Sequence, residues 1–212
     1  MDLVIGYIQM NQTIEYYNRN AGAFCESTIH ADMSYCRNRF LQYLSPGAFI
    51  LDAGCGSGRD SRHFLEQGFC IEAFDAAEEI CRLAEGHIGQ PVKCMRFEDM
   101  EYEERFDGIW ACASLLHINR EILPQILSRL HRALMPMGIL YASFKYGDTE
   151  NDKGERYFIN FTEDGIIELL EASAFTVLEC FVTSDVREGR SAERWVNVIG
   201  RRRQAYDSLL QR

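Results

Sequence analysis

One stretch decides the fold of this chain: Ile50-Leu51-Asp52-Ala53-Gly54-Cys55-Gly56-Ser57-Gly58-Arg59. A short apolar run leads into three glycines at alternate positions, and an amphipathic segment follows them. This order predicts a buried strand, a tight turn whose backbone can approach a ligand closely, and a helix. The dinucleotide-binding pattern Gly-x-Gly-x-x-Gly does not fit, because Arg59 stands at its third glycine. No Gly-Lys-Ser/Thr of an ATP-type phosphate-binding loop follows either.

The same order recurs downstream, because short apolar runs alternate with amphipathic segments from Phe49 onward. This alternation is typical of β-α-β units and a parallel sheet. We expect strands over residues 48–53, 69–75, 92–97, 106–112 and 139–144. We expect helices over residues 59–66, 78–85 and 122–134, and a further helix from the N-cap Thr162 to Ser173. Residues 147–153 are predicted to form a polar surface loop.

Both ends of the chain depart from this alternation. Residues 11–44 hold two helical patterns rich in aromatic side chains, and two β-rich runs, 175–183 and 195–199, leave no room for a helix between them. Such a pair of runs must be antiparallel. We therefore predict an α/β fold with a Rossmann-like doubly wound sheet of seven strands, five of them parallel and two in a C-terminal antiparallel pair. An N-terminal helical cap or lid, residues 1–45, should cover a domain that spans residues 46–212.

Composition and net charge limit the classes of function that this chain can have. Of the 212 residues 47% are hydrophobic, which suits one domain with a large core. The 22 Lys+Arg against 32 Asp+Glu give a net charge of −10, so no broad positive field attracts nucleic acid or anionic lipid. The longest uncharged apolar stretch, 108–118, is shorter than the ~18 residues that span a bilayer. The first six residues lack the basic region of a signal peptide, so we predict a cytoplasmic protein without a membrane segment.

The cysteines and histidines do not form recognisable metal motifs. None of the eight cysteines stands in Cys-x-x-Cys spacing, and several lie in apolar runs, so we expect reduced core residues instead of disulfides or a zinc site. The four histidines other than His117 also lack His-Glu-x-x-His spacing. No metal site is therefore predicted from His30, His63, His87 or His131.

The strand, the acid Asp52 and the Gly-x-Gly-x-Gly of residues 54–58 together resemble the first motif of the class I S-adenosylmethionine-dependent methyltransferases. The resemblance runs by motif from about residue 49 to residue 144. More narrowly, Gly56-Ser57-Gly58-Arg59-Asp60-Ser61 and the helical cap are similar to small bacterial methyltransferases labelled tellurite-resistance-like. The resemblance implies S-adenosylmethionine as methyl donor and S-adenosylhomocysteine as product. It also implies direct displacement by a nitrogen, oxygen or sulfur atom of a small-molecule acceptor.

The cofactor residues follow the strand ends. Asp75 closes the second strand and can accept hydrogen bonds from both ribose hydroxyls, the role that the upstream glycine motif favours over that of a solvated helix cap. The resemblance implies that Asp99 accepts from the adenine amino group and that the Met100 backbone meets the ring, the alternative for Asp99 being plain surface charge. It also places Ala111 and Cys112 near the methionine part. The predicted cofactor-binding residues are Asp52, Gly54, Cys55, Gly56, Gly58, Arg59, Asp75, Ala76, Glu98, Asp99, Met100, Ala111, Cys112 and Tyr17.

A catalytic base is needed only if the acceptor must lose a proton. His117 is the candidate, because it follows the fourth strand and imidazole titrates near neutral pH; a helix cap or a bond to a backbone carbonyl is the alternative. Tyr16 and Tyr17 could close over the ligand or simply belong to the core. The arginine-rich segment 185–195 could select an anion or form a solvated connection.

Several other functions were weighed. DNA base methylation is disfavoured, because residues 106–117 lack Asn/Asp-Pro-Pro-Tyr/Phe and a Pro-Cys nucleophile. A tRNA-modifying methyltransferase stays open, with Arg201-Arg202-Arg203 as a local contact that the net charge disfavours. A nucleotide-dependent oxidoreductase is disfavoured by Arg59. A non-catalytic S-adenosylmethionine-binding protein is the last alternative, and no oligomeric state is predicted.

Overall fold

The computed structural model of the chain describes residues 2–153 and 155–204. The helices are α1 (Asp2–Arg19), α2 (Ala21–Thr28), α3 (Ser34–Leu41), α4 (Arg59–Glu66), α5 (Glu78–Ile88), α6 (Leu123–Ala133) and α7 (Glu163–Ala172), with the 3-10 turns η1 (Phe97–Asp99) and η2 (Leu115–His117). The strands are β1 (Phe49–Ala53), β2 (Cys70–Asp75), β3 (Lys93–Cys94), β4 (Phe106–Ala111), β5 (Leu134–Tyr146), β6 (Glu150–Lys153), β7 (Arg156–Phe161), β8 (Phe175–Ser184) and β9 (Arg194–Arg202). In these described residues, no helix is long and apolar enough to cross a membrane.

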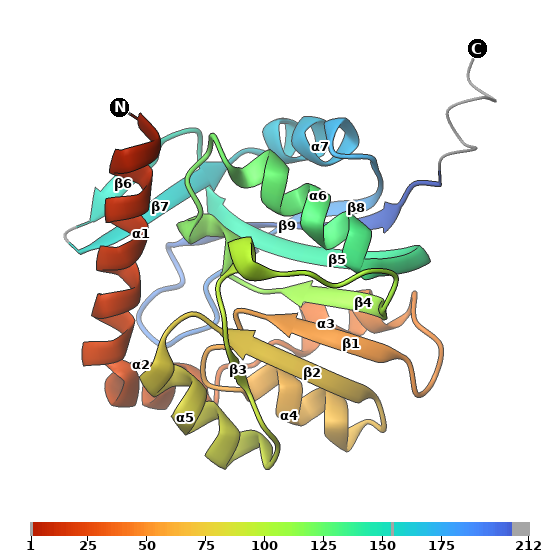
Figure 1. Cartoon of the computed structure of the whole chain (residues 1–212), viewed down its shortest axis with the longest axis horizontal. Coiled ribbons are helices and arrows are strands. Elements are labelled where there is room, and N and C mark those ends of the chain that lie inside the picture. Colours follow the sequence, from red (N-terminus) through yellow and green to blue (C-terminus); the bar gives the residue numbers. More distant parts are fainter. Residues whose placement is uncertain (1, 154, 205–212) are drawn as a thin grey trace.

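The centre of the sheet is parallel, in the order β3-β2-β1-β4-β5. Strand β9 runs antiparallel beside β5, and β8 runs antiparallel beside β9. The prediction of a mostly parallel Rossmann-like sheet with a C-terminal antiparallel pair is therefore confirmed. Figure 1 shows α1 crossing the ends toward which β1, β2 and β4 point. Ligands of such sheets bind at these carboxyl ends.

Alternate residues of β4 face opposite helical layers, because side chains of a strand alternate between its two faces. Ile109 and Ala111 pack in the cluster that includes α6 and α7. Trp110 packs in the cluster that includes α3, α4 and α5, and it stacks on Tyr141 with ring centroids 3.8 Å apart. Both faces of the central strands are thus buried, as the continuous apolar sequence of β4 predicted. Asp107 enters β4 at the opposite end and accepts a hydrogen bond from the Phe49 amide at 2.8 Å, which is a structural role.

The prediction of seven strands is wrong, since the sheet has nine in the described part of the chain. The expected loop 147–153 contains β6, which pairs antiparallel with β7, and β7 continues parallel to the end of β5. The polar sequence of β6 hides this strand, because backbone pairing at a sheet edge requires no apolar alternation. The run Tyr157 to Phe161 of β7 is buried and was the missed signal.

Three other boundaries differ from the sequence prediction. The third strand is only the two residues of β3, because the chain leaves the sheet after Cys94 and forms the 3-10 turn η1 from Phe97. The two expected N-terminal helical patterns form three helices, since the first pattern is divided at Asn20. Strand β5 begins at Leu134, directly after α6, five residues earlier than expected. None of these changes alters the order of the central strands.

A substitution at Gly54 can test how tightly the glycine loop is packed. Its φ is +76°, and a Cβ there would lie 2.4 Å from Ser114 Cβ. Gly68 also has a left-handed φ of +85° but has no atom within 4 Å of an added Cβ. We expect Gly54→Ala to reduce the free energy of unfolding by roughly 1 to 3 kcal/mol more than Gly68→Ala. Both substitutions strain the backbone, whereas only the Cβ added at position 54 also clashes with its surroundings. Urea unfolding of the two variants measures this, and equal losses would contradict the packing argument.

Candidate functional site

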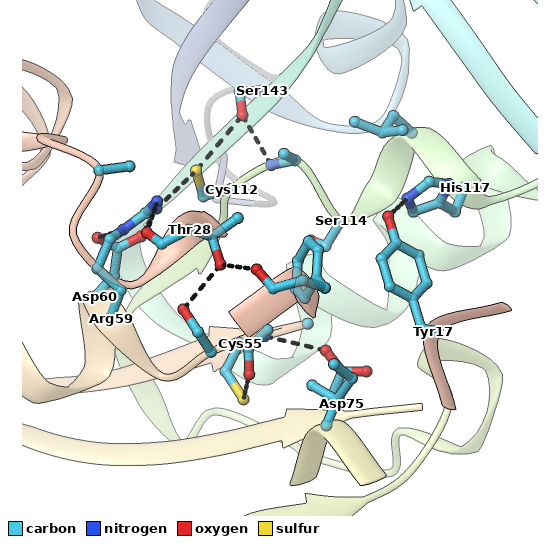
Figure 2. Close-up of a pocket in the computed structure, with 18 of the residues that line it drawn as sticks. Tyr17, Thr28, Cys55, Arg59, Asp60, Asp75, Cys112, Ser114, His117 and Ser143 are labelled. Carbon is cyan, nitrogen blue, oxygen red and sulfur yellow. Dashed lines mark hydrogen bonds and ion pairs between the residues drawn. The ribbon is translucent and has the colours of Figure 1, made fainter. Parts of the chain in front are cut away.

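A pocket lies at the carboxyl ends of the parallel strands, with a cavity volume of about 280 Å³. Its walls come from α1 and α2, the glycine loop after β1, the ends of β2 and β4, strand β7 and the segment after β8. Figure 2 shows side chains from these separate elements gathered around one space. Helices α1 and α2 therefore form one wall of the pocket.

The glycine loop is fixed by hydrogen bonds to the neighbouring strand. The amides of Gly54 and Cys55 both donate to the carbonyl oxygen of Phe74, each at 2.9 Å. The Gly56 amide donates to Asp75 Oδ2 at 3.1 Å. A Cβ on Gly56 would lie 3.3 Å from the ring of Phe24, so α2 packs directly onto the loop. The loop is thus held in an open, left-handed conformation between β2 and the cap.

Asp75 ends β2 with its carboxylate inside the pocket. One oxygen accepts from Gly56 and the other from the Ala77 amide at 3.0 Å. Burial raises the pKa of Asp75, and hydrogen bonds from backbone amides oppose this rise. An ionised carboxylate has about four acceptor positions. Two therefore remain for donors of a ligand, such as a pair of adjacent hydroxyls.

A buried charge cluster supports the pocket from the side of α4. Asp60 accepts from Arg59, from Arg37 of α3 at 2.9 Å and from Trp110 Nε1 at 2.9 Å. Burial raises the pKa of Asp60, but the two guanidinium groups outweigh burial and hold it below the usual value. The Arg59 guanidinium also reaches Cys112 Sγ at 3.9 Å (Figure 2). Asp60 therefore stays ionised and fixes Arg59 along the pocket wall.

Asp52 is the acid of the glycine motif, and its side chain is buried. It accepts a hydrogen bond from Ser61 Oγ at 2.6 Å. Burial, together with the nearby charge of Asp60, raises the pKa of Asp52 to about 7. Near neutral pH this carboxyl is poised between its two protonation states, so a cation bound close to it would favour ionisation.

The end of β4 is held in a strained turn. Ala113 has a φ of +53°, and its amide donates to Ser143 Oγ at 2.8 Å. Ser114 Oγ donates to the Ala53 carbonyl at 2.7 Å, which ties this turn to β1. A left-handed alanine costs of the order of 1 to 2 kcal/mol and persists only where the surroundings fix it. These two hydrogen bonds fix the turn that leads from Cys112 to η2.

His117 ends η2 and points at Tyr17 of α1 (Figure 2). Its Nδ1 lies 2.7 Å from the Tyr157 carbonyl oxygen, which only accepts, so Nδ1 carries the proton. Nε2 then accepts from the Tyr17 hydroxyl at 2.9 Å. Burial lowers the pKa of His117 to about 4, with smaller effects from its neighbours. The ring is neutral at physiological pH and offers one lone pair toward the Tyr17 oxygen.

The structure brings most of the predicted site residues together. The pocket lining contains Tyr17, Asp52, Gly54, Cys55, Gly56, Arg59, Asp75, Ala76, Glu98, Cys112 and His117. Gly58 lies outside the lining, because it packs against α5, where an added Cβ would be 2.6 Å from Ile88. Ala111 is enclosed in the core on β4.

Asp99 and Met100, for which the resemblance implies adenine contacts, do not line the pocket. Asp99 is exposed, and its carboxylate accepts from the Arg96 amide at 3.4 Å to cap η1. The Met100 side chain is in the core, and its carbonyl accepts from Arg129 at 2.7 Å. Glu98 lines the pocket instead, and in the described chain its buried Oε1 has no hydrogen-bond partner. Glu98 is therefore the acceptor that a ligand could satisfy here.

Other lining residues were not predicted, namely Phe24, Thr28, Lys145, Arg156 and Phe158. Thr28 donates to Ser57 Oγ at 3.2 Å, which joins α2 to the glycine loop. The aromatic pattern of the N-terminal helices was the available signal for Phe24. Arg156 and Phe158 lie on β7, a strand that the sequence analysis missed. Of the arginine-rich segment, Arg187 and Arg190 reach the lining.

The known proteins to which this chain is similar in sequence are methyltransferases. Residues 50–138 match the family described as a methyltransferase domain. An uncharacterized methyltransferase of Synechocystis sp. is 29% identical over 98 residues, which cover 45% of this chain and 46% of that protein. The malonyl-[acyl-carrier protein] O-methyltransferase of Erwinia pyrifoliae is 29% identical over 126 residues, which cover 56% of this chain and 47% of that protein. The chain thus spans about half the length of the curated relatives it matches.

A solved structure extends the likeness in fold to almost the whole chain. It is the 1,6-didemethyltoxoflavin-N1-methyltransferase of Burkholderia thailandensis, with 1,6-didemethyltoxoflavin and S-adenosylhomocysteine bound. The TM-score is 0.78 at 23% identity, and the match covers 96% of this chain and 91% of that one. At this identity the likeness concerns the fold, which includes the N-terminal helices and the C-terminal strand pair.

Asp52 makes stability depend on pH in a predictable direction. Its folded-state pKa of about 7 lies above its unfolded value of about 4, so the folded state binds more protons between these limits. Its contribution to stability is therefore greatest at low pH and declines as pH rises toward about 7. As pH rises from about 4.5 to about 8, we expect the free energy of unfolding of Asp52→Asn to increase by on the order of 1 to 3 kcal/mol relative to that of the unaltered protein. Urea unfolding at both pH values measures this, and a difference that does not change with pH would contradict it.

Proposed function

We propose that this chain is a class I S-adenosylmethionine-dependent methyltransferase and that it transfers a methyl group to a nitrogen, oxygen or sulfur atom of a small molecule. One observation carries the proposal. A single pocket joins the Asp75 carboxylate and the glycine loop to the neutral His117–Tyr17 pair. The first part suits an adenosyl group, and the second offers a proton acceptor to a nucleophile.

The residues present fit S-adenosylmethionine. Asp75 would hold the ribose hydroxyls with its two remaining acceptor positions. The buried Glu98 Oε1 would accept from the adenine amino group, which satisfies an otherwise unpartnered oxygen. Asp52, poised near neutral pH, and Arg59 would face the charged amino-acid part. When bound, the group supplies a methyl on a positively charged sulfur that leaves as a neutral thioether.

The protein's main chemical task is alignment, which can lower a barrier by about 7 to 11 kcal/mol. His117 and Tyr17 add a route for a proton. If the acceptor releases a proton to the Tyr17 oxygen, the Tyr17 proton moves to His117 Nε2, since that lone pair already accepts this hydroxyl. The low pKa of His117 makes it a weak base, so it takes the proton only as the new bond forms. The Tyr157 carbonyl holds the ring in this orientation.

The size and lining of the pocket favour a small acceptor. Tyr17 and Phe24 of the cap lie against the ligand space, with ring centroids 4.9 Å apart. A cavity of about 280 Å³ lies near the lower end of the ~300 to 1,000 Å³ typical of small-molecule sites. The net charge of −10 also opposes a polyanionic partner such as tRNA. A small-molecule acceptor is therefore the better candidate.

The cofactor assignment is tested at Asp75. Titration calorimetry should detect S-adenosylhomocysteine binding, and Asp75→Asn should weaken it roughly 10- to 100-fold, because hydrogen bonds to a charged acceptor are lost. Asp99→Asn is the matched control and should bind normally, since Asp99 is exposed and caps η1. Circular dichroism verifies that both variants fold. Normal affinity in Asp75→Asn would refute the ribose role, and no binding to the unaltered protein would refute the proposed function.

The proton route is tested by His117→Asn, whose amide can still donate to the Tyr157 carbonyl but removes Nε2. Formation of S-adenosylhomocysteine from S-adenosylmethionine with a metabolite pool should fall by roughly 10²- to 10⁴-fold, while cofactor affinity stays normal. The fall should be similar at about pH 6 and about pH 8, because a His with a pKa of about 4 is neutral at both. Unchanged turnover would remove His117 from the mechanism.

A further inference from the structure

Three cationic side chains converge on the His117–Tyr17 end of the pocket. Lys145 of β5, Arg156 of β7 and Arg187 all line it. After the larger effect of burial, the charges of Arg156 and Lys145 both lower the pKa of His117, which places both close to the ring. The charge of Arg156 likewise opposes the rise that burial causes in the pKa of Tyr17. This end of the pocket is therefore electropositive although the whole chain is acidic.

The three cations differ in their partners. Lys145 pairs with Glu193 at 2.8 Å, and Arg187 donates through Nε to Asp185 at 2.9 Å. Among the side chains that the structure describes, those of residues 9–150 and 155–204, no carboxylate lies within 4.0 Å of the Arg156 guanidinium. Its positive charge is thus the one at this end that no described acid neutralises.

Aromatic rings hold Arg156 in place. Its guanidinium lies 4.5 Å from the centroid of Tyr16 and 5.1 Å from that of Phe158. Stacking engages the face of a guanidinium and leaves the N–H groups in its plane available, apart from one that interacts with the Tyr17 hydroxyl. Those N–H groups match the two oxygens of a carboxylate in a bidentate pair. Arg156 is therefore oriented as a receptor for an anion and is not merely a charge in solvent.

The side chains around Arg156 also indicate the shape of the molecule that would carry the anion. The Phe158 ring lies 4.8 Å from the His117 ring and 5.1 Å from Lys145 Nζ. Trp195, 5.9 Å from Lys145 Nζ, also lines the pocket. Aromatic walls of this kind bind flat, apolar bodies. A ligand that places an acid on Arg156 would therefore lay a planar ring along Phe158, near the proton acceptor.

We infer that the methyl acceptor is a small aromatic or heteroaromatic carboxylate whose acid group pairs with Arg156. This inference rests on the proposed function and names its substrate class. One uncompensated cation matches one carboxylate, whereas a phosphate monoester would bring a charge of about −1.5 to −2. The carboxylate anchors the molecule, and the atom to be methylated lies elsewhere on it, beside His117 and Tyr17.

The test uses matched acids and amides with S-adenosylhomocysteine present: 4-hydroxybenzoate and 4-hydroxybenzamide, anthranilate and anthranilamide, nicotinate and nicotinamide. Titration calorimetry should show at least one acid binding roughly 10-fold or more tighter than its amide, as expected for a charge-assisted pair. Arg156→Gln should abolish that preference, and Arg156→Lys should restore part of it. Arg62→Gln, an exposed arginine of α4 paired with Glu66, removes the same charge outside the pocket and should leave the preference intact.

The outcomes separate the two proposals. If S-adenosylhomocysteine binds but no acid binds better than its amide, the acceptor inference is overturned and the methyltransferase proposal stands. A preference that survives in Arg156→Gln, or that Arg62→Gln removes equally, also overturns it. Phenyl phosphate binding more tightly than every acid would replace the carboxylate with a phosphate. Failure of S-adenosylhomocysteine itself to bind would instead refute the proposed function.

Discussion

The hydrogen bond from the Gly56 amide to the Asp75 carboxylate joins the two strand ends on which the site is built. Neighbouring bonds from Gly54 and Cys55 to the Phe74 carbonyl hold the same loop. A buried carboxylate is costly unless it is hydrogen-bonded, and these amides supply the donors. The loop is therefore set before a ligand arrives. Such preorganisation lowers the ordering cost of binding.

The buried cluster around Asp60 connects helix α3 to α4 and to the central sheet. Arg37 belongs to α3, Arg59 begins α4 and Trp110 lies in β4, yet all three donate to this one carboxylate. Breaking such a buried pair at one partner typically costs about 3 to 5 kcal/mol, because a charge is left without compensation. The cluster therefore holds α3 firmly while it fixes Arg59 at the pocket. The same arrangement explains Asp52, whose ionisation the nearby Asp60 charge opposes.

The sequence determines some of these features locally and others only through contacts distant in the chain. The glycine loop and Asp75 were predictable, because a strand end and a turn motif fix their positions within a few residues. Asp99 was not, since η1 is a three-residue turn in which a shift of one position exchanges a pocket residue, Glu98, for an exposed cap. Arg156 was missed with its strand: the apolar run of residues 157–161 signals a strand, but the pairing of β7 with β6 and with the end of β5 is not visible in the sequence. Its role depends on Tyr16 and Tyr17, which come from the other end of the chain.

The charges of the pocket are divided in a way that would suit the proposed transfer of a methyl group from a positively charged sulfur. Asp75, Asp52 and Glu98 come from the sheet end that carries the glycine loop and η1, and burial raises the pKa of the first two. A cation held there lowers both pKa values again, so binding and ionisation of these acids reinforce each other. Arg156 provides the opposite charge beside His117 and Tyr17. If the proposed cationic donor binds here, the acids would hold it more strongly than a neutral ligand of the same shape, and Arg156 would hold an anionic acceptor at the other end.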